Sequence, residues 1–135
     1  MTTRASLALP ALAAALLAFG FAGNALAQQA MEKGPKKAPL SYIADPKTYK
    51  LVAENKLFRV IIVTRPAGYR DKWHSHSALT LYNFGDCQTR LHTPDGKSMD
   101  VTNKAGSVVF NPAVASHSAE NIGTGECDGI IVERK

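Results

Sequence analysis

Two histidines close the segment Gly68-Tyr-Arg-Asp-Lys-Trp-His74-Ser-His76, and a third, His117, follows about forty residues later. Along a β-strand, residues two apart point to the same side, so His74 and His76 can face inward while Ser75 faces out. A third imidazole can then arrive from a distant strand. Because imidazole binds Zn, Fe, Ni and Cu well, the three histidines predict a transition-metal site built on β-structure.

The third histidine lies in a second segment, Gly106-Ser-Val-Val-Phe-Asn-Pro112-Ala-Val-Ala-Ser-His117-Ser-Ala-Glu-Asn121. Together the two segments resemble the paired motifs of the cupin superfamily. The first motif of that family runs Gly, five residues, His-x-His, three or four residues, Glu, six residues, Gly, and it is matched at Gly68, His74 and His76. The second runs Gly, five residues, Pro-x-Gly, two residues, His, three residues, Asn, and it is matched at Gly106, Pro112, His117 and Asn121, with Val114 in place of the family's glycine.

The first motif departs from the family at one metal ligand. The position of the family's glutamate holds Thr80, or Leu81 in the longer spacing, and the closing glycine comes early, at Gly85. The resemblance therefore implies a ligand set of three histidines, His74, His76 and His117, without the carboxylate. Thr80 has two interpretations, as a hydrogen-bond partner of a metal-bound water or as a β-branched strand residue that serves packing.

The resemblance covers Leu57 to Lys135 and implies an all-β fold, a double-stranded β-helix (the jelly-roll or cupin barrel). The strand pattern agrees, because Val60 to Val63 is a β-branched run and Thr93-Pro-Asp-Gly96 is a strong hairpin turn. No helical period appears after residue 40. We expect strands at residues 48–53, 57–65, 78–84, 88–92, 98–102, 108–110, 116–121 and 129–133. We expect the face of 78–84 that carries Thr80, Tyr82 and Phe84 to border the pocket.

Three neutral imidazoles leave the charge of a divalent metal uncompensated, so an anionic further ligand is expected. The missing carboxylate also favours Zn, Fe, Ni or Cu over the oxygen-preferring Mn and Mg. The expected partner is a small molecule, with a preference for anions. His92 stands beside the hairpin turn and is expected to lie away from the other histidines. Trp73 is expected to pack in the core or at the rim of the barrel.

Three functions fit these residues, and the sequence does not choose among them. The first is a protein that binds a divalent transition metal through His74, His76 and His117, with an unknown substrate or ligand. The second is a metal-dependent enzyme, such as a three-histidine dioxygenase that acts on thiols, a cupin type that also lacks the glutamate. The third is a metal-free barrel that binds a ligand or a partner. The same fold serves many reactions, so the fold alone identifies no catalytic residue.

The N-terminus resembles a cleaved secretory signal. Arg4 precedes an apolar stretch from Leu7 to Phe21, and a small-residue cleavage site follows at Asn24-Ala-Leu-Ala27. A membrane anchor is the alternative, but Pro10 and Gly20 interrupt the stretch and the cleavage site follows it directly. We therefore expect a signal peptide at residues 1–27, a flexible leader at 28–40, a cupin domain at 41–135, and a periplasmic or secreted protein without a stable membrane anchor after cleavage.

The formal net charge of +5 is thinly spread along the chain. Lys33, Lys36 and Lys37 form the densest basic cluster, and no basic stripe is interleaved with aromatic residues, so nucleic acid is not expected as a partner. Dimers are common among cupins, and the resemblance therefore allows a homodimer without indicating which edge strand it would use.

The chain has two cysteines, Cys87 and Cys127, and an exported protein can oxidise them. In the cupin arrangement the strand after the first motif lies antiparallel to the last strand, and these cysteines fall near the places where the two strands meet. The resemblance thus implies a disulfide. The alternative is a thiolate metal ligand or a redox thiol, which no Cys-x-x-Cys spacing supports.

Overall fold

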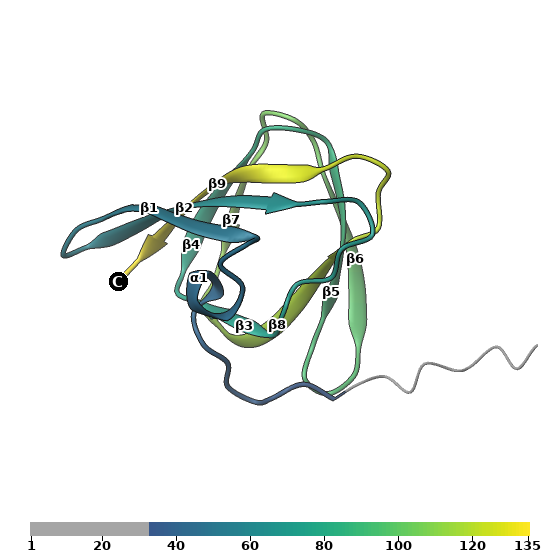
Figure 1. Ribbon diagram of the computed structural model, residues 1–135, viewed down its shortest axis with the longest axis horizontal. Helices are drawn as coiled ribbons and strands as arrows, with labels where there is room; N and C mark the ends of the chain where they lie inside the picture. Colours follow the sequence, from purple (N-terminus) through teal and green to yellow (C-terminus); the bar gives the residue numbers. More distant parts are fainter. Residues whose placement is uncertain (1–32) are drawn as a thin grey trace, which may run out of the picture.

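The computed structural model describes residues 33–135, so the predicted signal peptide at 1–27 and the first part of the predicted leader lie outside the described residues. The described chain forms two antiparallel sheets that close around one interior (Figure 1). One sheet has the strand order β1-β2-β9-β4-β7 and the other β3-β8-β5-β6. The prediction of an all-β barrel is therefore confirmed.

The strands are short and follow the predicted segments closely. The elements are α1 (Ser41–Ala44), β1 (Tyr49–Glu54), β2 (Phe58–Arg65), β3 (His74–His76), β4 (Leu79–Asn83), β5 (Cys87–His92), β6 (Ser98–Asn103), β7 (Val108–Asn111), β8 (Val114–Asn121) and β9 (Cys127–Arg134). The helix α1 was not expected, because a single turn is too short to show a helical period. It packs against β1 and β3.

Alternating burial along the strands builds the core. In β2, Ile61, Val63 and Arg65 are buried while their neighbours are more exposed. Ile131 of β9 lies opposite Ile61 in the antiparallel register, so both side chains enter the same layer. The apolar core consists of Tyr49, Ile61, Val63, Leu79 and Ile131.

Strand β4 presents the face opposite to the one predicted. Leu79 and Leu81 line the interior, whereas Tyr82 and Phe84 are exposed. Thr80 shares the outer parity and pairs with Val132 and Phe110 across the neighbouring strands. The expectation that the Thr80 face borders the pocket was wrong, because the inner face carries the aliphatic Leu79 and Leu81 and the outer face leaves Tyr82 partly exposed.

Cys87 and Cys127 form a disulfide that joins the start of β5 to the start of β9, with a Cα–Cα distance of 5.0 Å. The bond ties one sheet to the other, because β5 and β9 belong to different sheets. The pairing that the resemblance implied is confirmed.

The end of the predicted leader pairs with strands of the barrel through its backbone. The amide of Ala38 donates to the carbonyl of Ala115 at 3.0 Å, and Leu40 bridges to Ser75 of β3. Trp73 is half-buried, with the guanidinium carbon of Arg70 5.4 Å from its ring centroid. Backbone pairing therefore begins before Ser41. In the part of the chain described, no helix is long and apolar enough to cross a membrane.

Candidate metal centre

The predicted histidines converge on one point of the barrel wall. Strands β3 and β8 pair with His74 directly opposite His117, and the register is irregular between His74 and His76. One ring nitrogen from each of the three side chains lies within 4.8 Å of the others. The ring centroids are 4.4 Å apart for His74 and His117 and 5.3 Å apart for His76 and His117. The predicted convergence of the three rings is thus present in the structure.

His74 is held by its own loop. Its Nδ1 lies 2.7 Å from the carbonyl oxygen of Lys72, which can only accept a hydrogen bond, so Nδ1 carries the proton and donates. Nε2 is then left with its lone pair, on the side where the Tyr49 hydroxyl lies 3.2 Å away. The local loop therefore selects the tautomer that can bind a metal through Nε2.

His76 is oriented by a carboxylate from the last strand. Its Nδ1 hydrogen-bonds Oε1 of Glu133, a fully buried residue of β9. Arg59 lies behind this carboxylate, with Nη1 3.7 Å from Oε2. A carboxylate on the far nitrogen of a ligating histidine fixes its ring and raises its basicity, and it leaves Nε2 free for a metal.

His117 has a shielded nitrogen without a partner. Its Nε2 is buried and makes no hydrogen bond to any described residue. A buried polar atom without a hydrogen-bond partner lowers the stability of the folded protein unless an ion, a water or a ligand binds to it. A metal ion shared with Nε2 of His74 and His76 would do so, and three neutral imidazoles form a suitable donor set for Zn, Fe, Ni or Cu. The residues present therefore fit a transition metal.

Burial keeps His74 and His117 neutral. Loss of hydration lowers the pKa of His74 to about 4, although the nearby Asp71 opposes the shift. Burial, with further repulsion from His74 and His76, lowers the pKa of His117 to about 2. Both rings thus carry free lone pairs at neutral pH, as metal ligation requires.

A buried cluster of Tyr49, Arg65 and Asp71 borders the histidines. Arg65 donates from Nη2 to the Tyr49 hydroxyl at 2.6 Å and to the Asp71 carboxylate at 2.7 Å, and Tyr49 donates to the same carboxylate at 2.7 Å. Burial raises the pKa of Tyr49 well above its usual value, against the pull of Arg65, so the phenol stays protonated. The cluster places an arginine and a phenol beside the three rings.

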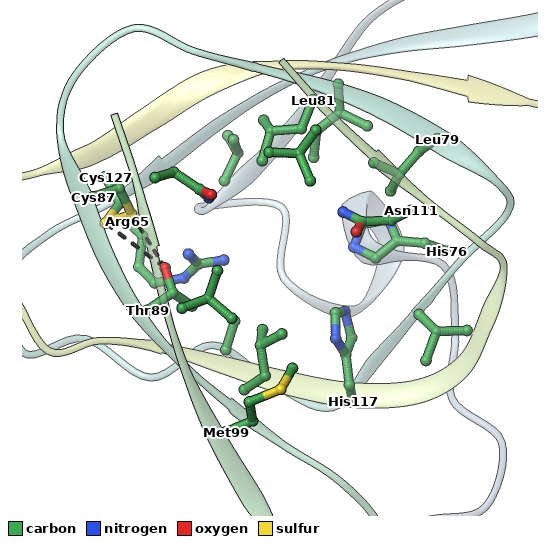
Figure 2. A pocket seen from close by; sticks show the side chains of 18 of the residues that line it. Arg65, His76, Leu79, Leu81, Cys87, Thr89, Met99, Asn111, His117 and Cys127 are labelled. Carbon is green, nitrogen blue, oxygen red and sulfur yellow. Dashed lines mark hydrogen bonds between the residues drawn. A yellow bond between two sulfur atoms is a disulfide. The ribbon is translucent and has the colours of Figure 1, made fainter. Parts of the chain in front are cut away.

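A cavity of about 740 Å³ opens onto this centre (Figure 2). His76, His117 and Arg65 line it, together with polar side chains such as Asn83 and Asn111 and a wall of aliphatic residues. Its volume lies within the range of sites for small molecules. The arrangement can therefore hold a metal at the wall of a chamber large enough for an organic ligand.

The structure is similar to solved cupin domains. A cupin domain from Bordetella pertussis Tohama I matches 76% of this chain and 99% of its own length, with a TM-score of 0.59 and 21% sequence identity. A RmlC-like cupin family protein with a double-stranded β-helix fold, from Methanocaldococcus jannaschii, matches 64% of this chain and 77% of its own length, with a TM-score of 0.52 and 16% identity. The chain has the cupin fold. No protein-family model and no curated protein matches the sequence.

The fold places Thr80, Leu81 and His92 outside the cluster of three histidines. Thr80, at the position of the family's glutamate, does not line the cavity, so it cannot contact a metal-bound water there. Leu81 lines the cavity with an aliphatic side chain. The Nε2 atom of His92 lies 3.0 Å from a carboxylate oxygen of Glu120, outside the histidine cluster, as expected.

Glu133, Arg65 and Tyr49 are not indicated by the histidine motifs, although strand parity is a signal for the first two. Glu133 shares the inward parity of Ile131 in β9, and Arg65 shares that of Val63 in β2. A charged residue on the inward face of a cupin strand needs a buried partner. The carboxylate that is absent from the expected position is thus supplied behind His76 by another strand.

Proposed function

We propose that this cupin is an exported protein that binds one divalent transition metal through Nε2 of His74, His76 and His117 and exposes that metal to a small molecule in its cavity. The buried Nε2 of His117, which has no hydrogen-bond partner among the described residues, carries this proposal. It belongs to a ring clustered with two other imidazoles, and each of those already has its Nδ1 in a hydrogen bond. When bound, such a metal supplies a Lewis acid or a redox centre. Zn, Fe, Ni and Cu are the candidates.

Metal analysis of purified protein tests the proposal. Wild-type protein is expected to retain about one equivalent of metal after dialysis, as a single shared site requires. The variant His117→Ala is expected to weaken metal binding by more than about a hundredfold, because losing only a supporting residue already costs about ten- to a hundredfold. His92→Ala is the matched control and should keep its metal. Metal content unchanged by His117→Ala would favour the metal-free barrel instead.

A metal-dependent enzyme is the second candidate. It is favoured by the cavity, which brings solvent and small molecules to His76 and His117. A dioxygenase acting on small thiols would match the three-histidine ligand set. Anaerobic reconstitution with Fe(II), followed by oxygen uptake with a panel of thiols, tests this version. Stoichiometric iron without oxygen uptake across the panel would eliminate it and leave the binding protein.

The proposed export rests on the signal-like residues 1–27 and is supported by the disulfide between Cys87 and Cys127, a bond that persists in oxidising compartments. Expression of the full chain in a Gram-negative host should give a processed protein in the periplasm that begins at Gln28. An unprocessed protein in the cytoplasmic or membrane fraction would contradict the proposed export.

A further inference from the structure

We propose that the cavity binds a monocarboxylic acid with an apolar body, whose carboxylate lies between the metal centre and Arg65. This inference rests on the proposed metal site and deepens it by naming the class of ligand. It follows from the charge balance at the centre, from the position of one guanidinium group and from the apolar lining of the cavity.

The buried carboxylates next to the histidines already have arginine partners. Asp71 accepts from Arg65 at 2.7 Å, and the Oε2 atom of Glu133 lies 3.7 Å from Arg59. A third buried carboxylate, Asp45, accepts a hydrogen bond from Tyr69 at 2.9 Å and does not line the cavity. A divalent metal on three neutral imidazoles would therefore add positive charge that is poorly balanced in a site of low dielectric.

The carboxylates that do line the cavity are engaged or directed elsewhere. Asp95 is exposed and pairs with Lys97 at 2.9 Å. Asp128 has the opposite parity to Cys127 and Gly129 in β9, so its side chain turns away from the inward-facing residues. A ligand that carries a negative charge would therefore balance the metal centre.

Arg65 is placed to receive such a charge. Its guanidinium points into the cavity (Figure 2), although the residue is only 6% exposed. Nε and Nη2 donate to Asp71 and Tyr49, whereas Nη1 makes no hydrogen bond to any described residue. The Tyr49 hydroxyl that accepts from Nη2 lies 3.2 Å from Nε2 of His74, so one phenol oxygen separates the guanidinium from the histidine cluster. A planar carboxylate can bridge the two, with one oxygen on each.

The rest of the cavity selects an apolar body. Aliphatic side chains from strands of both sheets line its wall, among them Leu79, Leu81, Leu91, Val101, Val109 and Ile131. An acid as small as acetate would leave most of the cavity of about 740 Å³ unfilled. A chain or ring system on the order of ten carbons would cover this wall and bury apolar surface.

Titration calorimetry of the zinc-loaded protein tests the inference, with decanoate, hexanoate and 1-decanol as probes. Decanoate is expected to bind roughly two-hundredfold more tightly than hexanoate, because each of its four additional methylenes contributes about fourfold when buried. It should also bind at least about tenfold more tightly than 1-decanol, which has the body without the charge. Equal affinity for decanoate and hexanoate would overturn the apolar body, and equal affinity for decanoate and 1-decanol would overturn the anion site.

Variants assign the effect to Arg65. Arg65→Gln should weaken the binding of decanoate at least about tenfold while zinc is retained. The double variant Arg65→Gln/Asp71→Asn should show the same loss, and it leaves no buried carboxylate without its arginine partner. Arg90→Gln is the control, since it makes the same charge change at an exposed pair with Asp100 outside the cavity. Unchanged affinity in the double variant would overturn the role of Arg65. Wild-type protein that holds zinc without binding decanoate would overturn only the ligand, whereas wild-type protein that fails to hold zinc would overturn the proposed function as well.

Discussion

Single side chains decide how the three imidazoles are presented. His74 is fixed by the carbonyl of Lys72 and His76 by the carboxylate of Glu133, while Nε2 of His117 has no hydrogen-bond partner among the described residues. The first two contacts select the tautomers that leave Nε2 free. The candidate site therefore depends on Lys72 and Glu133 as well as on the three histidines themselves.

Glu133→Gln is expected to weaken metal binding about ten- to a hundredfold without abolishing it. The amide can keep a hydrogen bond to His76, but it lacks the charge that raises the basicity of the ring. Competition with a chelator measures the affinity. Glu120→Gln, which alters the carboxylate next to His92, is the matched control. Equal affinity in wild type and Glu133→Gln would show that this carboxylate does not support the metal.

Acid should begin to destabilise the metal-free protein below about pH 6.5, which is above the pH range in which its carboxylates titrate. The pKa of His74 falls to about 4 and that of His117 to about 2 in the folded state, against 6.5 for the exposed side chain. Below pH 6.5 these two histidines therefore bind protons in the unfolded chain but not in the folded protein. The free energy of unfolding then drops by up to about 1.4 kcal/mol per pH unit for each histidine. Above pH 6.5 this contribution is constant.

Urea unfolding of chelator-treated protein at pH 7.5, 6.0 and 5.0 measures this slope. His117→Asn should have a shallower slope than wild type, because it removes one of the two titrating rings. A free energy of unfolding that stays flat from pH 7.5 to pH 5.0 would contradict the burial of neutral imidazoles.

At the scale of strands, the sequence predicted most elements but not which face of β4 turns inward. The segment 78–84 alternates apolar residues on both faces, Leu79 and Leu81 on one and Tyr82 and Phe84 on the other, so parity alone cannot choose. The choice depends on the register with β9, which pairs Leu81 with Ile131 of the core. That register is a long-range property that no local pattern contains.

The close approach of β4 and β9 requires a glycine at position 129. A Cβ atom there would lie 2.5 Å from the backbone oxygen of Tyr82 and 3.0 Å from Cδ1 of Leu81. Gly129→Ala should therefore lower the free energy of unfolding by about 1–3 kcal/mol, as overpacking does in cores. Gly125→Ala is the control, since nothing lies within 4 Å of its Cβ. Equal stability of the two variants in urea would contradict the tight pairing.

At the scale of the whole molecule, the histidine motifs predicted the barrel and the three candidate ligands. The contacts that support those histidines could not be predicted from the motifs. His76 and Glu133 are 57 residues apart, and Tyr49 and His74 are 25 apart. Each of these pairs meets because two sheets close around one interior. Motif spacing identifies a shared ligand set, but it does not reveal partners brought together by closure of the barrel.

The disulfide should contribute much of the stability of this small barrel. It closes a loop between positions 40 residues apart, which corresponds to about 4 kcal/mol in the chain-entropy model. Cys87→Ser/Cys127→Ser should lose a similar free energy of unfolding in urea. Reductant should destabilise the wild type and leave the double variant unaffected. A wild type indifferent to complete reduction would contradict this contribution.

The shared metal position can be tested directly by anomalous diffraction from crystals of zinc-loaded protein, recorded on both sides of the zinc absorption edge. One strong peak is expected about 2.0–2.1 Å from Nε2 of each of His74, His76 and His117. A crystal whose zinc peaks lie only on surface carboxylates or on His92, with no peak among the three rings, would contradict it.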